Sequence, residues 1–167
     1  MINREDISEI DLAYAAGIID GEGCIGIWRD ATRTRRRGYC ITLRVKVDMV
    51  DFVVPTWLKT KFGGSLRLSH KKGNRRDQYS WLLTARQARD FLGLVLPYLK
   101  TKRTHAEVAI EFQNLKVKLA GGRDSLGRFA LKSKALCEGE EILEKKMRDF
   151  NKRGIDGYSG VVAHGDI

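Results

Sequence analysis

Two acidic residues, Asp20 and Glu22, alternate with glycines at the end of a run of small residues, AYAAGIIDGEGCIGIW at positions 13–28. The small residues predict a helix, and Gly21 and Gly23 predict where it ends. Acids are electrostatically disfavoured at a helix C-terminus, because the macrodipole is negative there. Carboxylate oxygens are, however, ligands that Mg²⁺ prefers, and a divalent cation makes carboxylates compatible with nearby phosphates. The placement of these acids therefore calls for a partner other than the helix itself, and a divalent cation is one that carboxylates bind.

The composition bounds the kind of protein that carries these acids. The chain has 167 residues with 43% hydrophobic content, which is enough for one domain with its own core. Its formal net charge of +10 favours a polyanionic partner, most often nucleic acid. A ribosomal or general basic protein is the alternative, but 21 Asp and Glu residues are mixed among 31 Lys and Arg residues. This mixing indicates placed charges rather than a basic tail.

The three cysteines, Cys24, Cys40 and Cys137, form no CxxC pair and are odd in number. This pattern disfavours a zinc site or a disulfide framework and fits a reducing compartment. The sequence has no apolar run long enough to span a membrane, and its first residues lack a signal-peptide core. We expect an intracellular protein, cytoplasmic or organellar, that is not secreted and has no membrane partner.

Hydrophobic periodicity and turn residues predict the elements that position the acids. The first helix is expected to begin after Asp6 or Ser8, with Glu9 or Asp11 completing a capping box, and to end near Ile19. The other predicted elements are strands at 24–28, 39–48, 65–69 and 78–84, and helices at 53–62, 85–96, 101–119 and 134–150.

Alternation along the strands predicts which side chains are buried. Leu66 and Leu68 are expected to point toward the core, and Phe150 is expected on the buried face of the last helix. Thr84 and Gln87 resemble a second capping box. The clearest apolar row comprises Ile41, Leu43, Val45 and Val47.

The order of elements predicts an α+β fold with an αββαββα core. Its four strands would form one antiparallel sheet, with helices on one face and a DNA-binding saddle on the other. We expect a single domain over residues 1–167, with the core reaching to about residue 120 and a C-terminal helical extension over 121–167. A solvated polar face is the alternative for any one strand, but two hairpins with basic tips favour nucleic acid.

Outward side chains on the strands and loops are the predicted DNA contacts. Arg and Lys suit guanine, Gln suits adenine, and some of these residues are expected to touch only phosphates. The residues predicted to face bases are Trp28, Thr42, Arg44, Lys46, Arg67, Arg75, Arg76, Gln78 and Ser80. Further predicted contacts are Arg33, Arg35, Arg37, Lys71, Lys100 and Lys102.

The segment AAGIIDGEG at residues 15–23 resembles the LAGLIDADG motif of homing endonucleases and related maturases. It departs mildly from that motif, with Ala at the first position and Glu as the final acid. A second segment, PYLKTKR at 97–103, is similar to the lysine-bearing stretch before the long helix in single-motif members. The resemblance covers most of the chain to about residue 119 and is weaker beyond it.

The resemblance implies a homodimer, because one motif per chain supplies half of a composite centre. Ala13, Ala16, Gly17 and Asp20 lie at i, i+3, i+4 and i+7, so they form a nearly bare helix stripe that allows close backbone packing. In the family such stripes pack across a two-fold axis between protomers. A tight helix contact within one chain is the alternative.

The resemblance also implies roles at the centre. Glu22 of each protomer would hold Mg²⁺, with Ca²⁺ or Mn²⁺ as substitutes, while the Gly21 carbonyl faces the metal and Asp20 supports it. Lys102 would polarise water or steady the phosphate, and simple phosphate contact is the alternative. Asp48 is a candidate for positioning water, or it caps the next helix.

The implied activity is metal-dependent hydrolysis of both strands of a long pseudo-palindromic DNA site, leaving 3′ overhangs and promoting intron homing. Such a site spans about 20 base pairs, because half-sites repeat about one helical turn apart. Two alternatives share this scaffold. One is a maturase that binds intron RNA, and the other is a DNA-binding regulator that has lost cleavage.

Overall fold

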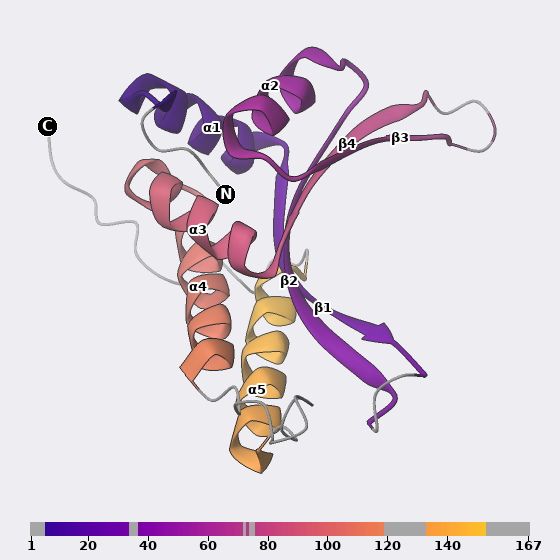
Figure 1. The fold of residues 1–167 in the computed structure, drawn as a ribbon, viewed down its shortest axis with the longest axis vertical. Coiled ribbons are helices and arrows are strands. Elements are labelled where there is room, and N and C mark those ends of the chain that lie inside the picture. Colours follow the sequence, from indigo (N-terminus) through magenta and orange to yellow (C-terminus); the bar gives the residue numbers. More distant parts are fainter. Residues whose placement is uncertain (1–5, 34–36, 72, 74–75, 119–132, 153–167) are drawn as a thin grey trace, which may run out of the picture.

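Figure 1 shows the fold in a computed structural model of the chain. The structure describes residues 6–33, 37–71, 73, 76–118 and 133–152. Its helices are α1 (Glu9–Gly21), α2 (Val53–Phe62), α3 (Ala85–Val95), α4 (Arg103–Lys118) and α5 (Lys134–Phe150), with a 3₁₀ turn, η2, at Leu96–Tyr98. Its strands are β1 (Gly23–Ala31), β2 (Tyr39–Met49), β3 (Ser65–Ser69) and β4 (Gln78–Thr84). The predicted order of elements is confirmed.

The four strands form one antiparallel sheet in the order β1-β2-β4-β3. Alternate residues share a face, so the register defines an inner face toward the helices and an outer face opposite. In Figure 1 the helices lie on the inner side, while the β1–β2 and β3–β4 hairpins diverge around a concave outer side. The inner face carries buried residues of two strands, Ile41, Leu43, Val45, Val47, Trp81 and Leu83.

Aromatic rings join the sheet to α2 and α3. The rings of Phe62 and Phe91 meet edge to face at a centroid distance of 4.9 Å, and Trp81 meets Phe91 at 5.4 Å. The Trp81 indole N–H donates to the Gly63 carbonyl at 2.8 Å, so its polar group is satisfied inside the core. Such pairs contribute about 0.5–1.5 kcal/mol beyond the area that they bury.

The predicted capping box of α1 is confirmed, with Ser8 as N-cap. The Asp11 N–H donates to the Ser8 hydroxyl at 3.1 Å, and the Asp11 carboxylate accepts the Ser8 N–H at 3.0 Å. Lys61 of α2 adds an ion pair with Asp11 at 3.0 Å. The predicted box at Thr84 is wrong, because Thr84 occupies the N-cap position of α3 without a side-chain hydrogen bond.

Two predictions of burial are wrong. Leu68 lies on the inner face as expected, but it is 45% exposed, because β3 is a short edge strand whose far end extends beyond the helices. Phe150 is 39% exposed, because it is the last residue of α5, and its ring meets His105 at a centroid distance of 5.4 Å. Among the described residues, we find no helix with the length and apolar character needed to cross a bilayer.

Candidate catalytic centre and nucleic-acid interface

Glu22 lies at the junction between α1 and β1. It is the C-cap of the helix, and its backbone N–H donates to the Ile18 carbonyl at 2.8 Å. Glu22 is exposed, and its carboxylate makes no hydrogen bond or ion pair with the rest of the described chain. The next residue, Gly23, packs so closely that an added Cβ would lie 2.7 Å from Cα of Ile19. Glycine is therefore required where β1 leaves the helix end.

Lys102 closes this helix end from the other side. Its ammonium donates to the carbonyls of Ile19 at 2.8 Å, Asp20 at 2.9 Å and Gly23 at 2.7 Å. The last carbonyls of a helix have no partner within the helix and carry its negative partial charge. The Lys102 ammonium therefore stabilises the C-terminal end of α1, where the negative partial charge is unfavourable for the nearby acids. Burial lowers the pKa of Lys102, while the negative charge of Asp20 opposes that shift.

Asp20 makes the reciprocal contact. Its carboxylate accepts the backbone N–H groups of Lys100 at 2.7 Å and Lys102 at 2.9 Å, directly before α4 begins. Burial raises the pKa of Asp20, but these N–H donors outweigh burial and hold the pKa below its usual value. An anion thus meets the positive end of α4, while a cation meets the negative end of α1. We call this set of contacts among Asp20, Lys100 and Lys102 the α1–α4 clasp.

The clasp refines the expected role of Lys102. All three N–H groups of its ammonium are donated to backbone carbonyls, so its contact with water or phosphate stays a prediction. The Gly21 carbonyl is not among those acceptors. Glu22, Lys102 and His105 line one pocket of about 840 Å³ that also contacts the C-terminal end of α5. The centre is therefore a concave space that has the Glu22 carboxylate and the Lys102 ammonium on its α1 side, while Glu144, Arg148 and Lys152 line its α5 side.

Part of the small-residue stripe on α1 makes contacts within this chain. Ala16 is fully buried, and the Asp20 side chain belongs to the clasp, as the intramolecular alternative describes. Packing of the stripe against a second copy stays a prediction. Ala13 and Gly17 are exposed. The helix twist places them on a face with Ile10, which is 80% exposed, and Tyr14, which is 48% exposed. This face is the part of α1 that remains accessible.

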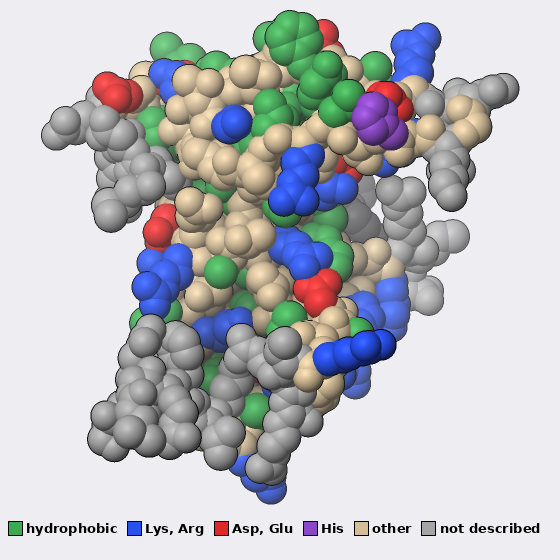
Figure 2. All heavy atoms as spheres, turned by 45° about the vertical axis from the view of Figure 1, so that its right-hand side comes forward, with side chains coloured by type: hydrophobic (Ala, Val, Ile, Leu, Met, Phe, Trp, Pro, Cys, Tyr) green, Lys and Arg blue, Asp and Glu red, His purple; other side chains and the backbone are tan. Residues whose placement is uncertain are grey.

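Most of the predicted DNA contacts share the outer face of the sheet. The strand register places there Trp28, Thr42, Arg44, Lys46, Arg67, Gln78 and Ser80. Figure 2 shows Lys and Arg side chains gathered over the sheet between the two hairpins. Arg33 and Arg76 are exposed at the hairpin ends, Lys100 is exposed beside the clasp, and Lys71 is partly buried. Arg35 and Arg75 lie outside the described residues.

Asp48 also lies on the outer face, near the centre. It follows Val47, which pairs with Gly23, and its carboxylate contacts the Lys46 ammonium at 2.6 Å. The alternative role as a helix cap is not observed, because Asp51 accepts the Val53 N–H at 2.6 Å instead. A role for Asp48 in positioning water remains a prediction.

Arg37 departs from the predicted outer position. Its guanidinium contacts Glu140 of α5 at 2.6 Å, so it is directed to the helix side of the sheet. The carboxylate of Glu140 is fully buried and also lies 3.6 Å from the Lys116 ammonium. Arg37 and Arg29 both stack on Tyr39, with their guanidinium carbons 4.6 and 4.4 Å from the ring centroid.

Two further acids of α5 complete this contact. The Tyr39 hydroxyl donates to Glu141, and Arg29 pairs with Glu144 at 3.3 Å. The acidic side of α5 thus holds the inner face of the β1–β2 hairpin beyond the apolar core. Helical spacing of acids in residues 138–144 was the available signal, but their partners on the hairpin, Arg29 and Arg37, lie over 100 residues earlier and share no local pattern with them.

The fold and site together define an α+β protein with a cationic concave sheet and an exposed carboxylate at the adjoining helix–strand junction. No protein-family model matches the sequence, and no curated protein matches it. Solved structures match over most of the chain. The homing endonuclease I-CvuI, complexed with a DNA target in the presence of Mg, matches with a TM-score of 0.71 and 17% identity over 87% of this chain and 84% of that chain.

Two other solved structures carry related descriptions. The archaeal intron-encoded homing endonuclease I-Vdi141I, complexed with DNA, has a TM-score of 0.67 and 15% identity over 87% of each chain. The I-SmaMI LAGLIDADG homing endonuclease, bound to cleaved DNA, has a TM-score of 0.59 and 20% identity over 79% of this chain and 42% of that chain. The chain therefore has the fold of the LAGLIDADG homing endonucleases, and the predicted resemblance is confirmed at the level of the fold.

The two glycines beside Glu22 provide a matched test of the helix–strand junction. Gly23→Ala is expected to lower the free energy of unfolding by about 1–3 kcal/mol, because its Cβ would overlap the backbone of Ile19. Gly21→Ala meets open space, so its stability should stay equal or rise slightly. Urea denaturation of both variants measures the difference. Equal stability of the two would contradict the close approach at Gly23.

The clasp predicts a stability role for Lys102 in the absence of DNA. Lys102→Met removes a cation that serves three carbonyls, and we expect a loss of about 2 kcal/mol in the free energy of unfolding. Lys100→Met is the control, because Lys100 enters the clasp through its backbone N–H alone. Chemical denaturation without DNA or metal measures both variants. An unchanged free energy of unfolding in Lys102→Met would show that the ammonium does not stabilise the helix end.

The α5 contact predicts an unequal response of two neighbouring glutamates. Glu140→Gln leaves Arg37 beside a neutral, buried partner, and should cost about 3–5 kcal/mol. Glu138→Gln removes an exposed i,i+4 pair with Lys134 and should cost less than about 0.5 kcal/mol. Thermal and urea denaturation give both values. Similar losses in the two variants would refute the buried pairing.

Proposed function

We propose that this protein is a site-specific DNA endonuclease that acts as a homodimer and requires a divalent metal ion. The observation that carries this proposal is the placement of Glu22. An exposed, unpaired carboxylate at the end of α1 adjoins a concave sheet face that is lined with basic residues. The match to DNA-bound homing endonucleases supports the same activity.

The outer face supports the choice of double-stranded DNA as substrate. A two-stranded β-ribbon fits the major groove of B-form DNA, and the hairpins provide two such ribbons. Arg44 and Arg67 suit guanine, whereas Gln78 suits adenine. The deep, narrow major groove of A-form RNA excludes side chains, which disfavours the maturase alternative for this face.

The residues at the junction fit a hard divalent cation. The Glu22 carboxylate is unpaired, and the neighbouring Gly21 carbonyl is not used by the clasp, so both present oxygen ligands. We infer Mg²⁺, with Mn²⁺ or Ca²⁺ as substitutes, and structures of I-CvuI were solved with Mg or Ca present. Such an ion supplies an activated water and stabilises charge on the phosphate oxygens. Lys102 holds the backbone on both sides of these ligands in place.

Dimerisation would bring two such junctions together. The described residues contain no group of three or more His, Cys, Asp and Glu side chains that could hold a metal ion. A second Glu22 and the DNA phosphates would complete the ligand set. The exposed face of α1 that carries Ile10, Ala13 and Gly17 is available for a second copy.

The products follow from this symmetry. Two centres related by a two-fold axis would cut opposite strands of a pseudo-palindromic site of about 20 base pairs. We propose staggered breaks with 3′ overhangs and a role in intron mobility inside the cell.

Cleavage by wild-type protein and Glu22→Gln tests the proposal. We expect wild type with Mg²⁺ to cut a DNA library at a long pseudo-palindromic site, and sequencing of the new ends to show 3′ overhangs. Glu22→Gln should bind the same site but cut it at least about 100-fold more slowly, because a metal ligand and its charge are lost.

The control is Glu111→Gln, which removes one exposed carboxylate from α4 and should cut like wild type. Binding without cutting by every variant would support the regulator alternative and overturn the nuclease. Equal cutting by Glu22→Gln and wild type would exclude Glu22 from the centre.

A further inference from the structure

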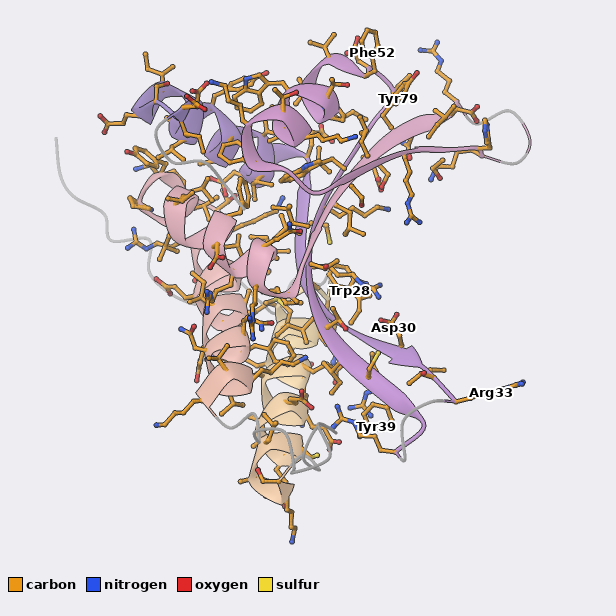
Figure 3. The ribbon with its side chains drawn as sticks, in the orientation of Figure 1. Trp28, Asp30, Arg33, Tyr39, Phe52 and Tyr79 are labelled. Atoms are coloured by element: carbon orange, nitrogen blue, oxygen red, sulfur yellow. The ribbon has the colours of Figure 1, made fainter. Side chains whose placement is uncertain are left out.

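A carboxylate lies within the cationic outer face of the β1–β2 hairpin. Asp30 of β1 forms an ion pair with Arg44 of β2, and the two side chains are 37% and 31% exposed. In Figure 3, Trp28 and Asp30 project from β1 on the concave side, whereas Tyr39 lies on the side of α5. Asp30 therefore points to the surface at which the proposed function places DNA.

The ion pair fixes the direction of Arg44. Arg44 is opposite Gly26 in the strand register, while Asp30 is four residues further along β1. To reach it, the Arg44 side chain lies along the sheet and over the Trp28 ring, with its guanidinium 5.7 Å from the ring centroid. Trp28 in turn covers Gly26, where an added Cβ would lie 2.6 Å from the indole. The Arg44 side chain is therefore held flat against the outer face by Gly26, Trp28 and Asp30.

Stability does not explain this arrangement. An exposed ion pair contributes about 0–1 kcal/mol. A carboxylate facing DNA is also repelled by the phosphates, so it weakens binding to DNA of arbitrary sequence. A base edge that donates a hydrogen bond offsets that repulsion. In the major groove cytosine N4 and adenine N6 carry amino groups that donate, and the cytosine N4 group is the usual partner of Asp. Guanine O6 and N7 are the acceptors that Arg contacts in bidentate fashion.

We propose that Asp30 and Arg44 form a specificity pair that selects one C·G base pair in each half-site. Asp30 accepts from cytosine N4, and Arg44 donates to guanine O6 and N7. Thymine and guanine present only acceptors to Asp30, so its carboxylate rejects them. Adenine offers the N6 donor, but its partner thymine gives Arg44 one acceptor where guanine gives two, so Arg44 disfavours an A·T pair. This inference rests on the proposed function, because it requires DNA on the outer face. Beyond the proposed function, it makes Asp30 a residue that selects by repelling the wrong bases as well as by attracting the right one.

The strand geometry predicts where that base pair lies. Asp30 is eight residues beyond Glu22, and β-strands rise about 3.3 Å per residue, so the two are separated by roughly 26 Å along the strand. Arg44 is opposite a residue four positions nearer to the centre. At about 3.4 Å per base pair, the selected position lies roughly four to eight base pairs from the centre of the site.

Selection from a randomised DNA library tests the pair. Wild-type protein should enrich C·G at one position of each half-site within that interval. Asp30→Asn, which removes the charge at constant shape, should lower this preference about 10-fold while binding unselected DNA more tightly. Arg44→Gln should lose preference at the same position. Asp90→Asn is the matched control, because Asp90 is an exposed acid paired with Arg89 on α3, on the helix side of the sheet.

Each outcome decides one claim. If wild type selects a site and Asp30→Asn enriches the same bases with the same strength, the specificity pair is refuted and the proposed function stands. If wild type enriches no sequence at all, the proposed function fails together with the pair. Loss of preference across the whole site at an unchanged melting temperature would assign Asp30 a general positioning role and overturn base selection.

Discussion

The clasp between α1 and α4 is the interaction on which the rest of the site depends. The C-terminus of α1 carries an unfavourable negative end, and the sequence adds two acids there. Lys102 offsets this charge by donating to three carbonyls around the helix end. Asp20 returns the contact at the start of α4, so each helix end receives the charge that its dipole favours. The clasp fixes the backbone on both sides of Glu22 and leaves the Glu22 side chain free.

Charge is divided between the two faces of the sheet in a similar way. On the inner face, beyond the apolar core, the basic residues Arg29 and Arg37 are paired with acids of α5. Glu140 is fully buried there, and such a charge is tolerated only with close partners. On the outer face the basic residues remain at least partly exposed. The acids of α5 therefore neutralise the cations of the β1–β2 hairpin that point inward.

Local patterns were sufficient to predict the element order and most outward residues. The alternation in β2 and the capping box at Ser8 depend on neighbours within a few positions, and both are confirmed. Ala16 shows the limit of such patterns. A small residue on a helix suits close packing, but its sequence neighbours do not determine whether the facing surface belongs to the same chain. Arg37 shows the same limit, because its partner Glu140 lies 103 residues away in the chain.

The two acids at the end of α1 show how one motif serves both structure and chemistry. Residues two positions apart on a helix do not face each other. Asp20 therefore turns toward α4 and is satisfied by backbone N–H groups, whereas Glu22, as the C-cap, is exposed. The intervening Gly21 bears no side chain, so the surface between the two acids stays open for a ligand or a second chain.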